Sequence, residues 1–336
     1  MSSWRNLKRS LKHVIKIWSY RAMTVEDFDE RYMRLALREA RKGLGRTSPN
    51  PCVGAVIVKN DELVSSGYHQ KAGTPHAEIN ALKGAGDNAR GATMYVTLEP
   101  CNHTGRTPPC SHAVAAAGIS RVVIGMQDPN PLVDGSGADY LRKRKVEVNL
   151  GVLEQECREL NRPFIKLITA SMPWVVMKAG MSLDGRLSYQ AGCGGVITGP
   201  ESRSMVHRMR DENDAILVGI GTVAADDPAL TTRLKNKKGR DPLRIILDTH
   251  LNIDENANVL NCVSDAQTWI FCSNSADRRK IELLEEKGVV VYRVDECPTG
   301  VNLKQVLKTV AEHGYGSVLV EGVQGYMAVF LMKCLS

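Results

Sequence analysis

The sequence predicts two consecutive α/β domains. Its 336 residues exceed the length over which one hydrophobic core usually keeps growing, so two domains are expected. Short apolar runs alternate with segments of helical periodicity along most of the chain, which is typical of α/β layers. The alternation is interrupted by the Thr-Ala-Ser-Met-Pro segment of residues 169–173. We therefore expect one domain over residues 24–168 and a second over residues 173–336.

The first expected domain begins with a helix and a hairpin. Thr24 and Asp27 are spaced as in a capping box, and apolar residues follow at helical spacing as far as Gly43. Two β-like runs joined across residues 59–61 predict the hairpin. The helices expected in this domain begin at Thr24, after His76, after Pro109 and at Leu153. The expected strands cover residues 53–58, 63–68, 93–98, 121–125 and 146–150.

The second expected domain repeats the alternation of strands and helices. It contains neither a GxGxxG segment nor a Walker loop, so we do not expect a nucleotide to be held by those phosphate-binding devices. The expected strands cover residues 174–179, 215–218, 243–247, 268–271, 289–292 and 317–320, and the expected helices lie near residues 201–211, 277–287 and 302–312.

The net charge of +7 is concentrated at the start of the chain. Six of the 44 basic residues and none of the 37 acidic residues lie within residues 1–23, so the rest of the chain is close to neutral. A basic groove for nucleic acid is therefore not expected. We expect residues 1–23 to be a disordered basic extension; a targeting segment, or translation starting at Met23, is the alternative.

The cysteines and the apolar runs of the sequence bear on cellular location and on membrane association. The nine cysteines are scattered and odd in number, unlike a secreted disulfide framework, which favours a reducing cytoplasm. No apolar run is long enough to span a bilayer, so a membrane protein is not expected.

Four residues of the first domain have the chemistry of a catalytic zinc site. His76, Cys101 and Cys110 offer one imidazole and two thiolates, and three protein ligands leave the fourth position of tetrahedral zinc to water. Glu78 lies two residues from His76, where a carboxylate can take a proton from that water and return it during the reaction. We therefore predict Zn²⁺ as a cofactor, with Glu78 as the catalytic acid and base.

Two alternatives remain for these residues. Each residue taken singly is commonly a core or surface side chain, but their order beside prolines argues against that interpretation for the set. A structural zinc site would need a fourth protein ligand, for which His103 or His112 is available nearby. Such a site would leave Glu78 without a role.

The spacing of the cysteines resembles one family of zinc deaminases. Nucleic-acid editing deaminases generally have PCxxC, whereas eight residues separate Cys101 from Cys110. This insert, residues 102–109, resembles the CxHxGxTPPC segment of the bifunctional riboflavin-biosynthesis deaminase–reductase family. Segments 48–54, 67–73 and 128–131 resemble that family too, and the similarity extends over about residues 24–321.

The resemblance implies a fold and two reactions. The fold is a cytidine-deaminase-like three-layer domain followed by a dihydrofolate-reductase-like α/β domain. The first domain would deaminate 2,5-diamino-6-ribosylamino-4(3H)-pyrimidinone 5′-phosphate with zinc, and the second would reduce the ribosyl group to ribityl with NADPH. The implied partner is this small-molecule pyrimidine ribosyl phosphate, without nucleic acid or membrane, and the family allows a homo-oligomer.

The resemblance also implies binding residues. Those of the pyrimidine pocket are Asn50 and His69. Those that contact NADPH are Gly180, Thr222, Asp226 and Thr249, and those that contact the substrate of the reductase are Arg210, Leu230, Arg233 and Glu321. Arginines suit this role because a guanidinium binds a phosphate with two hydrogen bonds.

Three departures from the family lie in the second domain. Gly194-Gly195-Val196 replaces a Ser-x-Trp segment, Val323-Gln324 replaces part of a glycine-rich turn, and the chain ends at Ser336. We expect the reductase-like domain to be C-terminally truncated. A deaminase with an inactive reductase-like domain therefore remains an alternative, as does a zinc module without catalysis.

Overall fold

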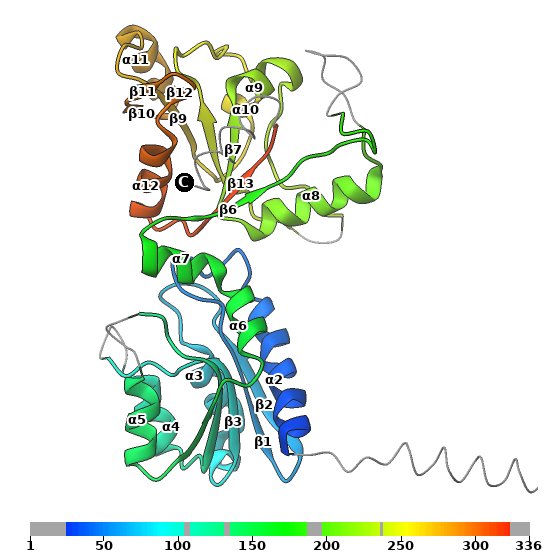
Figure 1. Ribbon diagram of the computed structural model, residues 1–336, viewed down its shortest axis with the longest axis vertical. Coiled ribbons are helices and arrows are strands. Elements are labelled where there is room, and N and C mark those ends of the chain that lie inside the picture. Colours follow the sequence, from blue (N-terminus) through cyan, green and yellow to red (C-terminus); the bar gives the residue numbers. More distant parts are fainter. Residues whose placement is uncertain (1–24, 104–107, 131–134, 187–196, 236–237, 323–336) are drawn as a thin grey trace, which may run out of the picture.

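The computed structural model describes residues 25–103, 108–130, 135–186, 197–235 and 238–322. Figure 1 shows two α/β units stacked along the long axis, with helix α7 (Arg162–Ala170) lying between their sheets. The predicted extension at residues 1–23, the departures at residues 194–196 and 323–324, and the predicted truncation all lie outside the described residues.

The first unit is built on a mixed five-stranded sheet with the order β2-β1-β3-β4-β5. Strand β1 pairs antiparallel with β2 and β3, whereas β3, β4 and β5 run parallel. The strands are β1 (Gly54–Lys59), β2 (Glu62–Tyr68), β3 (Thr93–Leu98), β4 (Arg121–Met126) and β5 (Glu147–Leu150).

Helices cover both faces of this sheet and complete three layers. Helices α2 and α6 contact one another on one face, and α3, α4 and α5 form a row on the other. The helices are α2 (Val25–Arg41), α3 (Ala77–Ala85), α4 (Cys110–Ala116), α5 (Ser136–Lys143), α6 (Glu154–Leu160) and α7, together with the short 3₁₀ helix η1 (Gly86–Ala89). Buried aliphatic side chains of the sheet and of α2 and α3 form one continuous core.

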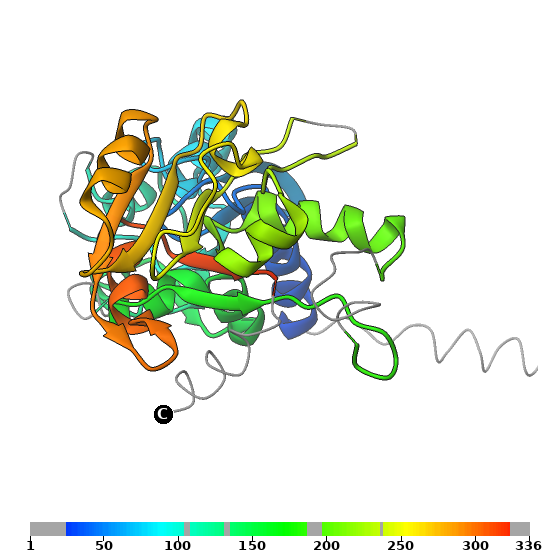
Figure 2. The same ribbon diagram turned by 90° about the horizontal axis from the view of Figure 1, so that it is seen from above.

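The second unit is built on a six-stranded sheet with the order β10-β9-β8-β7-β13-β6, in which every pair is parallel. In the view from above, the red strand β13 lies between the green strands β6 and β7 (Figure 2). The strands are β6 (Trp174–Met177), β7 (Ala215–Gly219), β8 (Leu243–Leu247), β9 (Thr268–Ser273), β10 (Val290–Val294) and β13 (Ser317–Val320), with a separate pair β11 (Glu296–Cys297) and β12 (Gly300–Val301).

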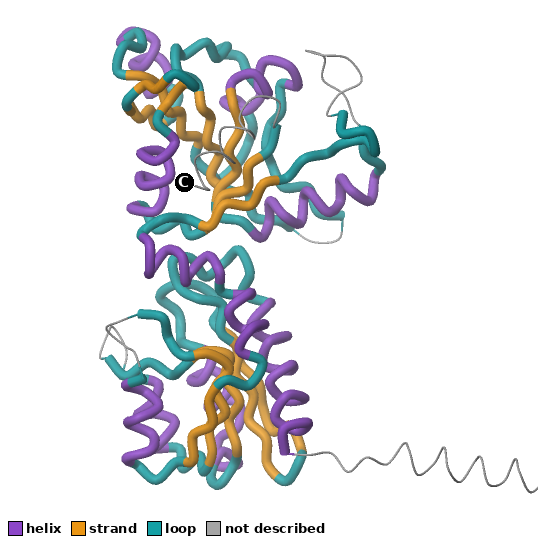
Figure 3. The backbone as a smooth tube through the Cα atoms, in the orientation of Figure 1, coloured by secondary structure: helices purple, strands orange, loops and turns teal. Residues whose placement is uncertain are grey.

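Both faces of this parallel sheet are covered, as parallel sheets require. Helix α12 packs into a core on one face, and α9, α10 and α11 pack into a second core on the other. Figure 3 shows the two groups of strands in orange, each flanked by purple helices. The helices are α8 (Pro200–Glu212), α9 (Ile220–Asp226), α10 (Asn258–Asn261), α11 (Arg278–Glu286) and α12 (Leu303–Glu312).

The structure confirms the two α/β units and departs from the prediction in the helices of the first, where α5 was not predicted and one predicted helix is divided. The predicted helix from residue 153 to about 168 is divided at Asn161 into α6 and α7. The buried Asn161 side chain accepts a hydrogen bond from the Cys52 backbone N–H at 2.8 Å and donates one to the Cys52 carbonyl at 3.1 Å. Asn161 therefore ties the break between the two helices to the segment that precedes β1.

Among the described residues, no helix is both long enough and apolar enough to cross a membrane.

Candidate active sites

Three elements of the first domain bring the predicted zinc ligands together. His76 is the residue before α3, Cys101 lies in the segment after β3, and Cys110 is the first residue of α4. The Nδ1 atom of His76 lies 3.3 Å from Sγ of Cys110 and 3.7 Å from Sγ of Cys101. Ligand atoms around tetrahedral zinc lie about 3.5 to 3.8 Å apart, given the usual Zn–S and Zn–N bond lengths. The three side chains therefore fit one zinc ion.

This cluster holds three protein ligands within the described residues, and these are His76, Cys101 and Cys110. Of the two histidines available as a fourth ligand, His112 stacks on the Tyr140 ring with their centroids 4.0 Å apart, and His103 lies outside the cluster and is exposed. Zinc with three protein ligands keeps one position for water, which is the arrangement of catalytic rather than structural sites.

The two thiols are electrostatically unequal. The pKa of Cys101 is lowered, chiefly by its hydrogen bond with Cys110 and further by His76. The pKa of Cys110 is raised because it is the partner that holds the shared proton and because it is buried. The backbone N–H of Cys110 also points at Sγ of Cys101, at 3.4 Å, which favours the thiolate. Both features favour the thiolate form of Cys101, which is the form that binds a metal cation.

Glu78 is buried beside this cluster, with 3% of its surface exposed. It lies in the first turn of α3, and burial raises its pKa to about 7 because desolvation disfavours the carboxylate. A carboxyl group with such a pKa can both accept and donate a proton near neutrality, which suits general acid and base catalysis.

Helix α3 is seated closely on the sheet, which fixes both His76 and Glu78. A Cβ atom at Gly67 of β2 would lie 2.5 Å from Ala81 N and 2.6 Å from Ala77 O. Only glycine permits this approach of strand and helix. The zinc-site helix is therefore held by backbone packing as well as by its apolar side chains.

Asn50 and His69 lie next to the zinc cluster. The Nδ2 atom of Asn50 is 3.1 Å from Nε2 of His69, and Nδ1 of His69 is 3.3 Å from the Pro75 carbonyl. With Asn50 donating to Nε2, the proton of the neutral ring resides on Nδ1 and points at Pro75. The His69 and His76 rings meet edge to face with their centroids 5.3 Å apart.

Sequence reasoning missed a role for Glu99, which precedes Pro100 and Cys101. Its buried carboxylate accepts hydrogen bonds from the backbone N–H groups of Gly137 and Ala138, both at 3.0 Å, at the start of α5. A Cβ at Gly137 would also clash with the Pro100 carbonyl. Glu99 thus anchors α5 against the segment that carries Cys101. The sequence could have indicated this role, because Glu99 is an acidic residue that lies between the buried strand β3 and the predicted zinc ligand Cys101.

In the second domain, four of the predicted binding residues follow parallel strands at one edge of the sheet. Gly180 follows β6, Thr222 follows β7, Thr249 follows β8 and Glu321 follows β13. Ligands of open α/β sheets bind outside the carboxyl ends of the strands. The hydroxyl of Thr222 donates to the carbonyl of Gly322 at 3.0 Å, which joins the segments after β7 and β13.

Arg210 and Glu321, both predicted to contact substrate, bind one another. The Nε and one terminal nitrogen of Arg210 donate to the two carboxylate oxygens of Glu321, both at 2.9 Å. A second terminal nitrogen donates to the Thr231 carbonyl at 3.0 Å, and Lys178 lies 3.8 Å from Glu321. Both partners are almost buried.

Three predicted binding residues remain in this domain: Leu230, Arg233 and Asp226. Leu230 is buried and adopts a left-handed backbone with φ of 53°, which is rare for a branched side chain and is found at strained functional sites. Arg233 is exposed, and its backbone N–H donates to His207. Asp226 is the last residue of α9, four residues after Thr222 and on the same helix face.

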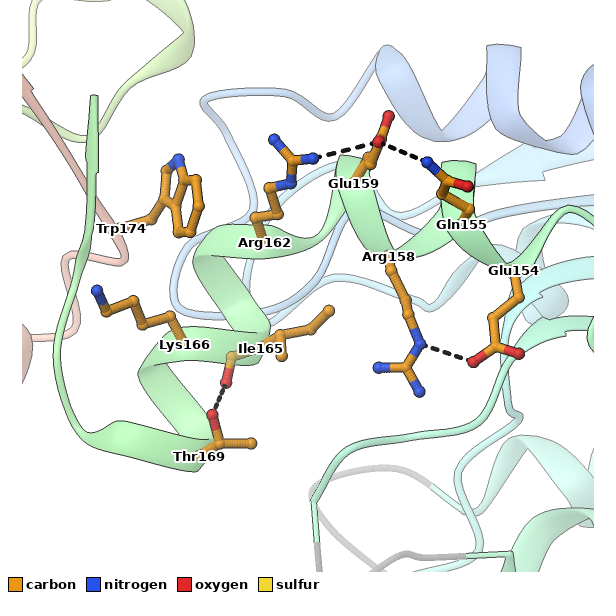
Figure 4. A pocket seen from close by; sticks show the side chains of 9 residues that line it. All are labelled: Glu154, Gln155, Arg158, Glu159, Arg162, Ile165, Lys166, Thr169 and Trp174. Atoms are coloured by element: carbon orange, nitrogen blue, oxygen red, sulfur yellow. Dashed lines mark hydrogen bonds and ion pairs between the residues drawn. The ribbon is translucent and has the colours of Figure 1, made fainter. Parts of the chain in front are cut away.

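A groove of about 670 Å³ lies elsewhere, along α6 and α7 (Figure 4). Its charged side chains are paired with each other, as Arg158 is with Glu154 at 2.6 Å and Arg162 with Glu159 at 3.2 Å. Arg162 and Lys166 also lie against the face of Trp174. The groove contains none of the predicted catalytic residues.

Comparison with known proteins identifies both units. Residues 26–126 match the cytidine and deoxycytidylate deaminase zinc-binding region, and residues 173–332 match the RibD C-terminal domain.

Similar proteins cover most of the chain. The riboflavin biosynthesis protein RibD of Aquifex aeolicus is 46% identical over 92% of this chain and 85% of its own length. RibD of Bacillus amyloliquefaciens is 43% identical over 88% of this chain and 78% of its own length.

Solved structures agree in fold. RibD of Acinetobacter baumannii superposes with a TM-score of 0.82 at 37% identity, covering 92% of this chain and 85% of its own. A diaminohydroxyphosphoribosylaminopyrimidine deaminase/5-amino-6-(5-phosphoribosylamino)uracil reductase from Thermotoga maritima has a TM-score of 0.81 at 38% identity, with the same coverage. These likenesses span both the deaminase-like and the reductase domain, and the chain belongs to the RibD family of riboflavin biosynthesis proteins.

Proposed function

We propose that this enzyme performs two consecutive steps of riboflavin biosynthesis on a diaminopyrimidinone ribosyl phosphate: deamination in the first domain and NADPH-dependent reduction in the second. The observation that carries the first step is the cluster of His76, Cys101 and Cys110 beside the buried acid Glu78. The deaminase and reductase named in the Thermotoga maritima protein support this substrate.

In the deaminase, His76, Cys101 and Cys110 would hold zinc. Zinc bound there would supply a Lewis acid that lowers the pKa of the attacking water. Glu78 takes one proton from the attacking water and delivers it to the ring nitrogen, and then takes the second proton from the added hydroxyl and delivers it to the departing ammonia. Asn50 and His69 orient the pyrimidine beside the metal. Their mutual hydrogen bond fixes the His69 ring, and it leaves the carboxamide oxygen of Asn50 to accept from the substrate.

In the reductase, NADPH supplies the hydride that converts the ribosyl group to ribityl. Gly180, Thr222, Asp226 and Thr249 are proposed to bind this cofactor, and Arg233 and Leu230 the substrate. The pair of Arg210 and Glu321 links α8 to the segment after β13 near the reacting carbon. Arg233 is the better candidate for the phosphate, because its side chain is exposed whereas Arg210 is paired with Glu321.

The finer features of the prediction are part of this proposal. We propose domain limits of 24–168 and 173–336, a small molecule rather than nucleic acid as the ligand, no membrane association, and a homo-oligomer as the assembly. The seven cysteines found within the described residues are all free, which supports a reducing cytoplasmic location.

Removal of zinc tests the division of labour. A protein stripped by a chelator is expected to lose deamination and to recover it with added Zn²⁺, because the reacting water then lacks its Lewis acid. Reduction of the separately prepared deaminated intermediate is expected to continue at the original rate. Ammonia release and NADPH oxidation measure the two steps. Deamination that persists in zinc-free protein would contradict the proposal.

A further inference from the structure

We propose that the second domain positions the pyrimidine-binding side of the deaminase site, by holding the loop of residues 46–50 through Asp211 and Asp214. This inference rests on the proposed function, because it concerns how Asn50 meets the substrate of the deaminase. The loop joins α2 to β1 and has no regular secondary structure. The side chains of Arg46 and Ser48 in this loop bond to residues of the second domain.

Arg46 makes the first contact across the domains. Its guanidinium donates to the Asp211 carboxylate at 2.7 Å and to the Asp211 carbonyl at 2.9 Å. Asp211 is 4% exposed, and the same carboxylate oxygen also accepts from the Arg240 backbone N–H at 2.8 Å. Next to Arg46, Gly45 has a φ of 68°, and a Cβ there would clash with the Asp211 carbonyl. The loop and the end of α8 are therefore in direct backbone contact.

Ser48 makes the second contact. Its hydroxyl donates to Oδ2 of Asp214 at 2.6 Å. The same oxygen accepts from the backbone N–H groups of Gly316 and Ser317, at 2.9 and 3.0 Å. Asp214 is thus fixed by the start of β13 before it receives Ser48. The loop docks on a rigid acceptor rather than on a mobile surface side chain.

A short chain of contacts leads from this interface to the zinc cluster. Asn50 lies two residues after Ser48, and its backbone N–H donates to the Thr47 carbonyl at 2.8 Å. Its side chain bonds to His69, whose ring contacts that of the zinc ligand His76. A loop released from Asp211 and Asp214 therefore moves Asn50 relative to His69, whereas His76, Cys101 and Cys110 keep their own supports.

The expected consequence is a change in substrate binding rather than in the chemical step. The interface residues touch neither zinc nor Glu78, so kcat is expected to stay within about twofold. The KM of deamination is expected to rise, because Asn50 must be ordered by the substrate itself.

The test uses the full chain and steady-state deamination with KM and kcat read separately. Arg46→Gln and Asp211→Asn remove the same ion pair from opposite sides. Each is expected to raise KM about 3- to 10-fold, and the combined variant to raise it no further than the stronger single variant. Ser48→Ala is expected to raise KM, and Ser48→Thr to restore it because the hydroxyl is retained. Zinc content is expected to stay unchanged in all of them.

Arg34→Gln is the matched control, because Arg34 forms an exposed ion pair with Glu30 within α2 and does not contact the second domain. Unchanged KM in Arg46→Gln and Ser48→Ala, or additive effects in the combined variant, would overturn the inference while leaving the deaminase intact. If these variants lost bound zinc and their kcat fell as well, the inference would also be overturned, because the contacts would then support the fold of the whole zinc site and not the position of Asn50. A wild-type chain without deamination would overturn the proposed function and this inference with it.

Discussion

Replacement of Glu78 by glutamine is expected to lower kcat/KM for deamination by about 100- to 10,000-fold, the usual contribution of a general acid and base. Glutamine fills the same buried space but cannot carry a proton between water, ring and leaving group. The zinc ligands remain, so one zinc ion per chain should still be bound. Reduction of the deaminated intermediate should be unaffected, because Glu78 lies in the other domain.

Glu62→Gln is the control for this change, since Glu62 is an exposed carboxylate at the start of β2 in the same domain. It should leave both activities and the zinc content unaltered. Metal analysis distinguishes a catalytic zinc site from a zinc module without catalysis. If the site is catalytic, the Glu78→Gln protein is expected to bind zinc but to be inactive. Full activity in that variant would indicate a zinc module in which Glu78 has no chemical role.

The second large effect is expected from the buried pair of Arg210 and Glu321. Glu321→Gln leaves the cations Arg210 and Lys178 facing each other without their carboxylate. Breaking a buried ion pair from one side costs about 3 to 5 kcal/mol, so the second domain should unfold at lower urea concentration. Reduction should fall about 30-fold or more, equivalent to about 2 kcal/mol, whereas deamination should continue.

A double replacement distinguishes a structural from a functional role of this pair. Arg210→Met/Glu321→Leu removes both charges, and such apolar replacements are often neutral or stabilising. We expect the double variant to regain stability but not reduction. Within residues 25–322 the tryptophans are Trp174 and Trp269, both in the second domain, so their fluorescence reports its unfolding. Recovery of reduction together with stability would show that the pair only supports the fold.

The strands were predictable because their residue types match their burial. The run that forms β7 is apolar throughout, that of β8 is apolar except for Arg244, and both are fully buried, as expected of central strands in a parallel sheet. Helices were harder. Helix α5 was not predicted, because Gly135, Ser136 and Gly137 are poor helix formers. It is held by the distant carboxylate of Glu99, which no local pattern reveals.

The site was predictable where chemistry constrains the residue types. Zinc needs imidazole and thiolate, so His76, Cys101 and Cys110 could be identified from type and order alone. A substrate contact of Arg210 stays a prediction, whereas its pairing with Glu321, 111 positions away in sequence, is a contact that no local pattern predicts. Ser48 and Asp214 are neighbours only in the folded chain, so the spacing of residues along the sequence does not predict a contact between them.

The most direct test of the account is the mass of the product formed from the diaminopyrimidinone ribosyl phosphate, measured with and without NADPH. Without NADPH, we expect a product in which one amino group is replaced by oxygen. With NADPH, we expect that product to gain two hydrogen atoms, one as a hydride on the ribosyl carbon and one as a proton on the ring oxygen released from that carbon. An unchanged substrate in the presence of zinc-loaded protein would contradict the proposed deaminase, and a product that is reduced but not deaminated would contradict the proposed order of the two steps.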